Sequence, residues 1–106
     1  MRKNKNFQAV YRAGKSYANR MAVLYILPNK TSSRRIGFAA GKRLGGAVVR
    51  NRVKRLLREA YRLHQELLVT GFDLVLVGRQ GIKEAKLPAV VRAFLDLCAR
   101  AKIIKK

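Results

Sequence analysis

The residues best suited to chemistry in this sequence are basic, and they crowd into one segment. Between Arg34 and Arg62 there are 10 Lys and Arg residues and a single acid, Glu59. A guanidinium group can donate paired hydrogen bonds to phosphate oxygens or stack on a nucleobase, so this segment predicts binding to a polyphosphate. The alternative is a solvated helix face, but such faces usually mix charges of both signs.

Acid–base or metal-dependent chemistry by the protein itself is not predicted. A metal-dependent nuclease needs clustered carboxylates, and the acids here are few and scattered. The single histidine, His64, and the single cysteine, Cys98, do not give a zinc-binding spacing, and both are interpreted as packing residues. No glycine-rich phosphate-binding motif is present. We therefore expect no catalytic residue in this chain. The acids are Glu59, Glu66, Asp73, Glu84 and Asp96.

A few aromatic residues form a second candidate site. Aromatic rings beside Lys and Arg offer a stacking platform for single-stranded nucleic acid. Phe38 is interpreted as a core residue, whereas for Phe7 and Tyr11 core packing and base stacking both stay open. The residues considered are Phe7, Tyr11, Tyr25 and Phe38.

Composition sets the class of partner. The chain has 106 residues, of which 49% are hydrophobic, and a net charge of +20. Such a chain can build a core, but its like charges repel one another, which favours a polyanionic partner. Nucleic acid is the first choice and an anionic membrane surface the second. The longest apolar run, residues 21–27, is too short to span a membrane, and the first residues lack a signal peptide's apolar stretch. With one cysteine, this predicts a cytoplasmic protein.

Hydrophobic periodicity predicts an α/β (α+β) two-layer sandwich with one small sheet, in a single domain over residues 1–106. Along the longest helix, apolar residues from Val49 to Leu67 fall on one arc, and Arg52, Arg55, Arg58 and Arg62 fall on the opposite arc. Gly71 is expected to break this helix. The expected order is helix 6–13, strand 18–27, strand 34–40, helix 47–68, strand 72–78 and helix 88–101.

The segment GKRLGGAVVRNRVKRLLREAYR, residues 41–62, closely resembles the bacterial ribonuclease P protein family. That family carries an Arg-Asn-Arg motif in a basic helix that follows a glycine turn, and the motif here is Arg50-Asn51-Arg52. FQAVYRAG resembles the family's first helix, and ANRMAVLYIL resembles its first strand. The likeness extends over nearly the whole chain.

The resemblance implies a left-handed β-α-β crossover, contrary to the usual right-handed rule. It also implies two RNA-binding surfaces. One is a cleft for the single-stranded 5′ leader of precursor tRNA, lined by Phe7, Tyr11 and Tyr25. The other contacts the catalytic RNA through Lys42, Arg43, Arg50, Asn51, Arg52, Lys54, Arg55, Arg58 and Arg62.

The same resemblance implies the reaction. The RNA, with its own Mg²⁺, would remove the 5′ leader of precursor tRNA by endonucleolytic cleavage, and the protein alone would be inactive. No obligate protein partner and no membrane are implied, and no metal ligand is assigned to a particular residue.

The main alternative is a ribosomal or other structural RNA-binding protein, which shares the size and charge but needs no aromatic cleft. A basic transcription factor would need a turn-separated helix pair or a dimer seam, and neither is visible. A protein-only nuclease is disfavoured by the scattered acids.

Overall fold

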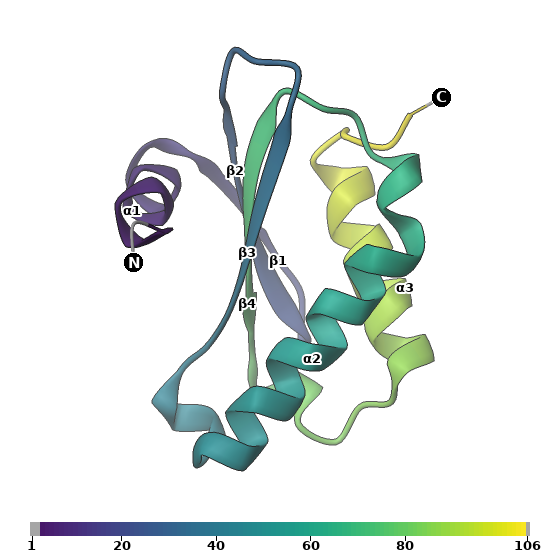
Figure 1. Ribbon diagram of the computed structural model, residues 1–106. Coiled ribbons are helices and arrows are strands. Elements are labelled where there is room, and N and C mark those ends of the chain that lie inside the picture. Colours follow the sequence, from purple (N-terminus) through teal and green to yellow (C-terminus); the bar gives the residue numbers. More distant parts are fainter. Residues whose placement is uncertain (1–2, 106) are drawn as a thin grey trace.

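The structure, a computed structural model, describes the backbone of residues 3–105 and the side chains of residues 8–105. One sheet and three long helices form the fold, with short 3₁₀ turns between them (Figure 1). In chain order the elements are α1 (Lys3–Ala13), β1 (Lys15–Ala18), β2 (Ala22–Pro28), β3 (Arg34–Ala40), η1 (Lys42–Leu44), α2 (Ala47–His64), η2 (Gln65–Leu67), β4 (Phe72–Gly78), η3 (Gln80–Ile82) and α3 (Leu87–Arg100).

The sheet has the strand order β1-β2-β4-β3. Neighbouring strands are antiparallel except β3 and β4, which are parallel and joined by α2. In Figure 1 the chain runs down β3, up α2 on the right and down β4 behind β3, so the crossover is left-handed. This is the arrangement that the family resemblance implies, against the usual right-handed rule.

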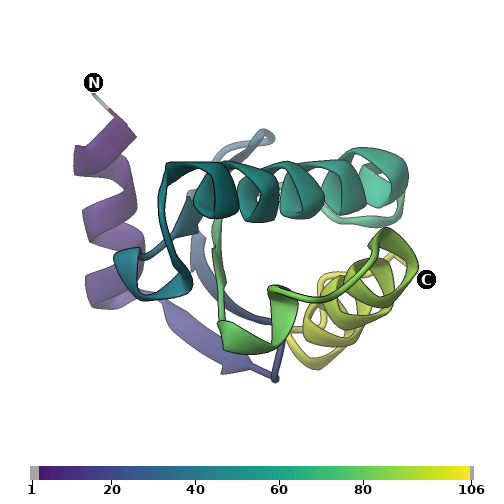
Figure 2. The ribbon, with the colours of Figure 1, turned by 90° about the horizontal axis from the view of Figure 1, so that it is seen from below.

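The helices are divided between the two faces of the sheet. α2 and α3 cover one face, and α1 lies on the other (Figures 1 and 2). The alternation of β2 explains why both faces need cover: Ala22, Leu24 and Ile26 belong to the main core, while Val23 and Tyr25 point the other way. On the α1 face, Val10 and Val75 are fully buried outside that core cluster.

The main core lies between the sheet and the pair α2 and α3. α2 contributes Val53, Leu57 and Ala60, and α3 contributes Phe94 and Leu97, all essentially inaccessible. Cys98 belongs to the same cluster, as expected, and burial raises the pKa of its thiol to about 12. A thiol in that state is almost entirely un-ionised at neutral pH and is a packing group. Within the described residues, no helix is long and apolar enough to cross a membrane.

The fold class is confirmed, with one more strand than expected. The strands predicted over 34–40 and 72–78 have those bounds, and the helices begin and end within a few residues of their predicted limits. The single strand predicted over 18–27 is wrong, because the chain reverses at Asn19 and forms the hairpin of β1 and β2. Asn19 Oδ1 accepts hydrogen bonds from the backbone N–H groups of Met21 and Ala22 at 3.0 and 3.1 Å.

The predicted helix 47–68 ends early, at His64, and continues as the 3₁₀ turn η2. Leu67, expected on the apolar arc, is therefore 45% exposed. The side chain of Arg34 binds this end of the helix: its guanidinium donates to the backbone carbonyls of Gln65, Leu68 and Val69 at 3.0–3.2 Å. A cation bound to carbonyls just beyond a helix C-terminus fixes the path of the chain there and interacts favourably with the helix dipole. Gly71 adopts a φ of +92°, a value that favours glycine, but the helix has already ended at His64, so the prediction that Gly71 breaks it is wrong.

Candidate nucleic-acid interface

The outer side of α2 carries a ridge of polar residues facing solvent. Asn51, Arg55, Arg58 and Arg62 follow one another at helical spacing, and all four are exposed. The buried residues Val53, Leu57 and Ala60 lie on the opposite side of the helix, against the sheet. The sequence prediction of a helix with one packed side and one cationic side is confirmed.

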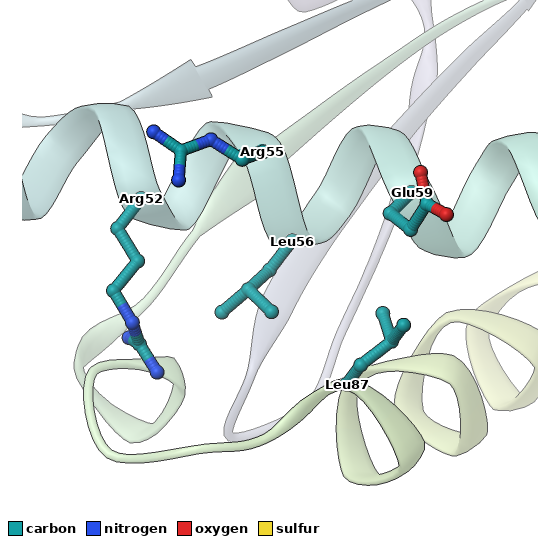
Figure 3. A pocket seen from close by; sticks show the side chains of 5 residues that line it. All are labelled: Arg52, Arg55, Leu56, Glu59 and Leu87. Carbon is teal, nitrogen blue, oxygen red and sulfur yellow. The ribbon is translucent and has the colours of Figure 1, made fainter.

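Arg52, also exposed, behaves differently from its neighbours. Its Nη1 donates to the carbonyl of Lys83 and its Nη2 to the carbonyl of Ala85, each at 2.9 Å. Figure 3 shows its side chain leaving α2 toward the segment that leads to Leu87, whereas Arg55 points away from that segment. Two donors of the Arg52 guanidinium are thus already engaged inside the molecule.

Two residues of the ridge also make contacts on the protein surface. The guanidinium of Arg58 lies over the ring of Phe38, 5.6 Å from its centroid, and this holds the cation against β3. Phe38 itself packs on the core, as predicted. Arg62 forms an ion pair with Glu59, whose pKa the Arg62 hydrogen bond lowers. Glu59 therefore stays ionised at neutral pH and cancels much of the Arg62 charge.

The remaining predicted cations lie around the start of α2. Lys42 and Arg43, in η1, are exposed, and Arg50 and Lys54 are half-buried. Within residues 8–105, no hydrogen bond or ion pair from the Lys42, Arg43, Lys54 or Arg55 side chain is found, which leaves these groups available to a ligand. The Arg50 Nε is buried and has no hydrogen-bond partner among the same residues.

The aromatic residues meet on the other face of the sheet. The rings of Tyr11 in α1 and Tyr25 in β2 pack edge to face, with centroids 4.8 Å apart. Tyr11 is 42% exposed and Tyr25 is half-buried. Partial burial, and then the neighbouring Tyr25, raise the pKa of Tyr11, so its hydroxyl stays protonated at neutral pH. Phe7 belongs to α1, but its side chain lies outside the described residues.

A cation on the same face of the sheet as this tyrosine pair was not predicted from the sequence. Arg35 in β3 forms a bidentate contact with Asp73 in β4, at 3.1 and 2.7 Å, and Asn29 also donates to Asp73 at 2.9 Å. The strand register places Arg35 and Asp73 on the same face as Tyr25, one row of side chains further along the strands. Asp73 is on the strand next to Tyr25, and Arg35 is two strands, or about 10 Å, across the sheet from it. Alternation along the strand 34–40 could have revealed this, since Arg35 cannot share the core face of Ile36 and Phe38.

Within the described part of the chain, no group of three or more His, Cys, Asp or Glu side chains could hold a metal ion. Asp73, the only buried charged residue found there, has its carboxylate occupied by Arg35 and Asn29. What the described side chains offer a ligand is therefore cations and aromatic rings.

Comparison with known proteins agrees with this character. Residues 1–102 match the family model for ribonuclease P. The ribonuclease P protein component of Natranaerobius thermophilus is 42% identical over 106 residues, which cover all of this chain and 92% of that protein. The ribonuclease P protein of Staphylococcus aureus superposes with a TM-score of 0.87 at 32% identity, covering 99% of this chain and 96% of that one. That of Thermotoga maritima superposes with a TM-score of 0.85 at 27% identity, covering 94% of each chain. The chain therefore belongs to the family of bacterial ribonuclease P proteins, the protein components of a ribonucleoprotein endoribonuclease.

Proposed function

We propose that this protein uses two surfaces, one for each RNA of the reaction. The first, which we call the α2 surface, binds the catalytic RNA of ribonuclease P through Lys42, Arg43, Arg50, Asn51, Arg52, Lys54, Arg55, Arg58 and Arg62. The second, which we call the tyrosine surface, binds the single-stranded 5′ leader of precursor tRNA through Tyr11, Tyr25 and Phe7, with Arg35 on the same face of the sheet. Cleavage takes place in the cytoplasm, at Mg²⁺ ions held by the catalytic RNA.

One observation carries this proposal: the cationic ridge of α2 and the Tyr11–Tyr25 pair lie on different sides of one sheet. Closely spaced cations with few acids suit the phosphates of a folded RNA, because each neutralised phosphate releases counterions. A partly exposed tyrosine pair suits unpaired bases, which stack on aromatic rings with little regard to sequence. The separation lets one protein hold both RNAs at once.

The state of Arg50 adds support on the α2 surface. A buried guanidinium nitrogen without a partner is unfavourable in the free protein. Binding of a phosphate that draws this side chain outward would relieve that cost, so part of the binding free energy comes from the protein itself.

A pair of substitutions tests the two surfaces separately. Arg55→Ala should weaken assembly with the catalytic RNA and lower the salt dependence of binding by about one counterion or less. Tyr11→Ala should leave assembly intact but cost the holoenzyme roughly 1–3 kcal/mol in binding precursor tRNA. Tyr11→Phe, which keeps the ring, is the matched control and should bind normally.

Mature tRNA provides the decisive comparison, because it has no leader. The Tyr11→Ala defect should vanish with mature tRNA, and equal losses on both tRNAs would contradict the leader assignment. Cleavage assays at low Mg²⁺ should show activity for the protein with catalytic RNA and none for RNA-free protein. Cleavage by RNA-free protein that survives ribonuclease treatment would contradict the division of labour.

A further inference from the structure

The segment from Arg79 to Lys86, between β4 and α3, is tied to the basic region at two points. Arg52 donates to the carbonyls of Lys83 and Ala85, as described above. The side chain of Gln80 donates to the carbonyl of Arg43 in η1 at 3.1 Å. The Arg52 tie holds the backbone of the segment directly, whereas the Gln80 tie uses a side chain of the segment itself.

A groove of about 320 Å³ lies between α2 and the start of α3 (Figure 3). Leu56 and Leu87 give it an apolar lining, and Arg52, Arg55 and Glu59 complete its walls. Lys86, which immediately precedes Leu87, is exposed. Because Glu59 is already paired with Arg62, the charges of the described lining residues that no carboxylate there neutralises are those of Arg52 and Arg55.

We propose that Arg52 is a positioning residue, which holds the segment 83–86 against α2 so that Lys86 extends the cationic surface across the groove. The ligand of this extended surface is the sugar-phosphate backbone of the catalytic RNA, to which its positive charge is complementary. This inference rests on the proposed function of the α2 surface. It gives Arg52 a different role from Arg55: Arg52 acts through the segment, and Arg55 acts directly on phosphate.

The first test needs no RNA. Hydrogen exchange of the free protein follows the amides of Lys83 and Ala85, which donate to the carbonyls of Gln80 and Ile82 at 3.2 and 3.1 Å. Arg52→Ala should accelerate their exchange about tenfold or more, because local opening no longer breaks the Arg52 hydrogen bonds. Amides of β4 should be unchanged, which establishes that the variant is folded. Arg55→Ala is the matched control and should leave all these amides unaffected.

The second test measures coupling between Arg52 and Lys86 in binding to the catalytic RNA. In the otherwise native protein, Lys86→Ala should reduce the slope of log K for RNA binding against log salt concentration by up to about 0.9. In an Arg52→Ala background the same substitution should have less than half that effect, because the segment is already released. Lys105→Ala, which lies beyond the C-terminal end of α3, is the control for loss of one lysine and should have little effect. Arg52→Lys keeps the charge but not the paired donors, so it should fail to restore slow exchange.

The outcomes separate this inference from the proposed function. Unchanged exchange in Arg52→Ala, or additive effects of the Arg52 and Lys86 substitutions, would overturn the inference. Should Arg52→Ala not fold, full exchange protection in Arg52→Lys would overturn it equally. If Arg55→Ala weakens binding of the catalytic RNA and Lys86→Ala does not, the proposed α2 surface is supported and its extension to Lys86 is contradicted. If the Arg52 and Lys86 substitutions have coupled effects on RNA binding and Arg55→Ala has none, the extension through Lys86 is supported. The proposal that Arg55 binds phosphate directly would then be contradicted.

Discussion

Asp73 is a carboxylate in a place that would ordinarily favour the neutral acid. Burial raises its pKa, but the hydrogen bonds from Arg35 and Asn29 and the charge of Arg35 outweigh that effect, so the pKa is lowered overall. Asp73 is therefore ionised at neutral pH and holds Arg35 in place on the face of the tyrosine surface.

The lowered pKa predicts how stability depends on pH. A carboxyl group whose pKa is lower in the folded state stabilises the fold fully above its unfolded pKa of about 3.9. That contribution is lost as the pH falls through the folded value. Asp73→Asn should lower the free energy of unfolding at pH 7 by about 1 kcal/mol, a modest value because Arg35 is 54% exposed and water screens the pair.

Denaturant unfolding of both proteins from pH 7 to pH 2 would check this. The gap between native protein and Asp73→Asn should be constant above about pH 5 and should narrow below about pH 4. A gap of the same size at both ends of the range would mean that the charge of Asp73 is not what stabilises the fold.

At the scale of elements, the periodic pattern was enough to place the strands and helices but not their ends. Strand 72–78 could be predicted because it is a largely apolar run that follows Gly71, and strand 34–40 because it lies between a polar turn and Gly41. The end of α2 could not, because it is bound by Arg34, a residue far away in the sequence. The hairpin at Asn19 was missed because it has no glycine, and its turn is stabilised by an asparagine side chain.

The same limit applied to the candidate site. The sequence revealed which helix is basic, because charge and period are local properties. It could not reveal that Arg34 binds carbonyls at the end of α2, that Arg35 binds the carboxylate of Asp73, or that Arg52 binds the segment before α3. Those partners are brought close only by the tertiary fold, so arginines that look alike in the sequence have different roles.

The binding of the α2 end by Arg34 yields a prediction for this element. Arg34→Ala should lower the free energy of unfolding by roughly 2–3 kcal/mol, because several carbonyls and the hydroxyl of Tyr61 lose a charged donor. Arg34→Lys should restore less than half of this, since one ammonium group cannot reach the same acceptors. Denaturant unfolding at fixed ionic strength would measure both.

Arg35→Ala is the natural control for that experiment. It removes an arginine at the next position, but its partner is the single carboxylate of Asp73, and half of its side chain is in water. Its loss of stability should be clearly smaller than that of Arg34→Ala. Equal losses of stability would show that Arg34 contributes through its charge in general and not through its hydrogen bonds at the end of α2.

For the whole molecule, the dominant quantity is the net charge of +20 on 106 residues. Repulsion between like charges opposes the compact state, and an anion that binds the folded form opposes that repulsion. Sulfate should therefore raise the melting temperature more than chloride at equal ionic strength. Sulfate at about tenfold its dissociation constant would stabilise the folded state by about 1.4 kcal/mol and raise the melting temperature by about 6 °C.

Thermal melts in matched sulfate and chloride buffers would test this prediction. A variant with both Arg55→Ala and Arg58→Ala should show a smaller difference between the two salts, because it lacks two exposed cations of the α2 ridge. Identical midpoints in sulfate and chloride would mean that the anion acts only by screening.

The burial of Cys98 has a practical consequence. The single thiol of the chain lies in the core with no accessible surface, and its pKa of about 12 makes it unreactive there. A thiol reagent can modify it only while the core is open, so at reagent concentrations at which modification outpaces reclosing, the labelling rate equals the rate of that opening. Cys98 is thus a native probe of core opening, and its labelling can be measured with and without RNA in the unaltered protein.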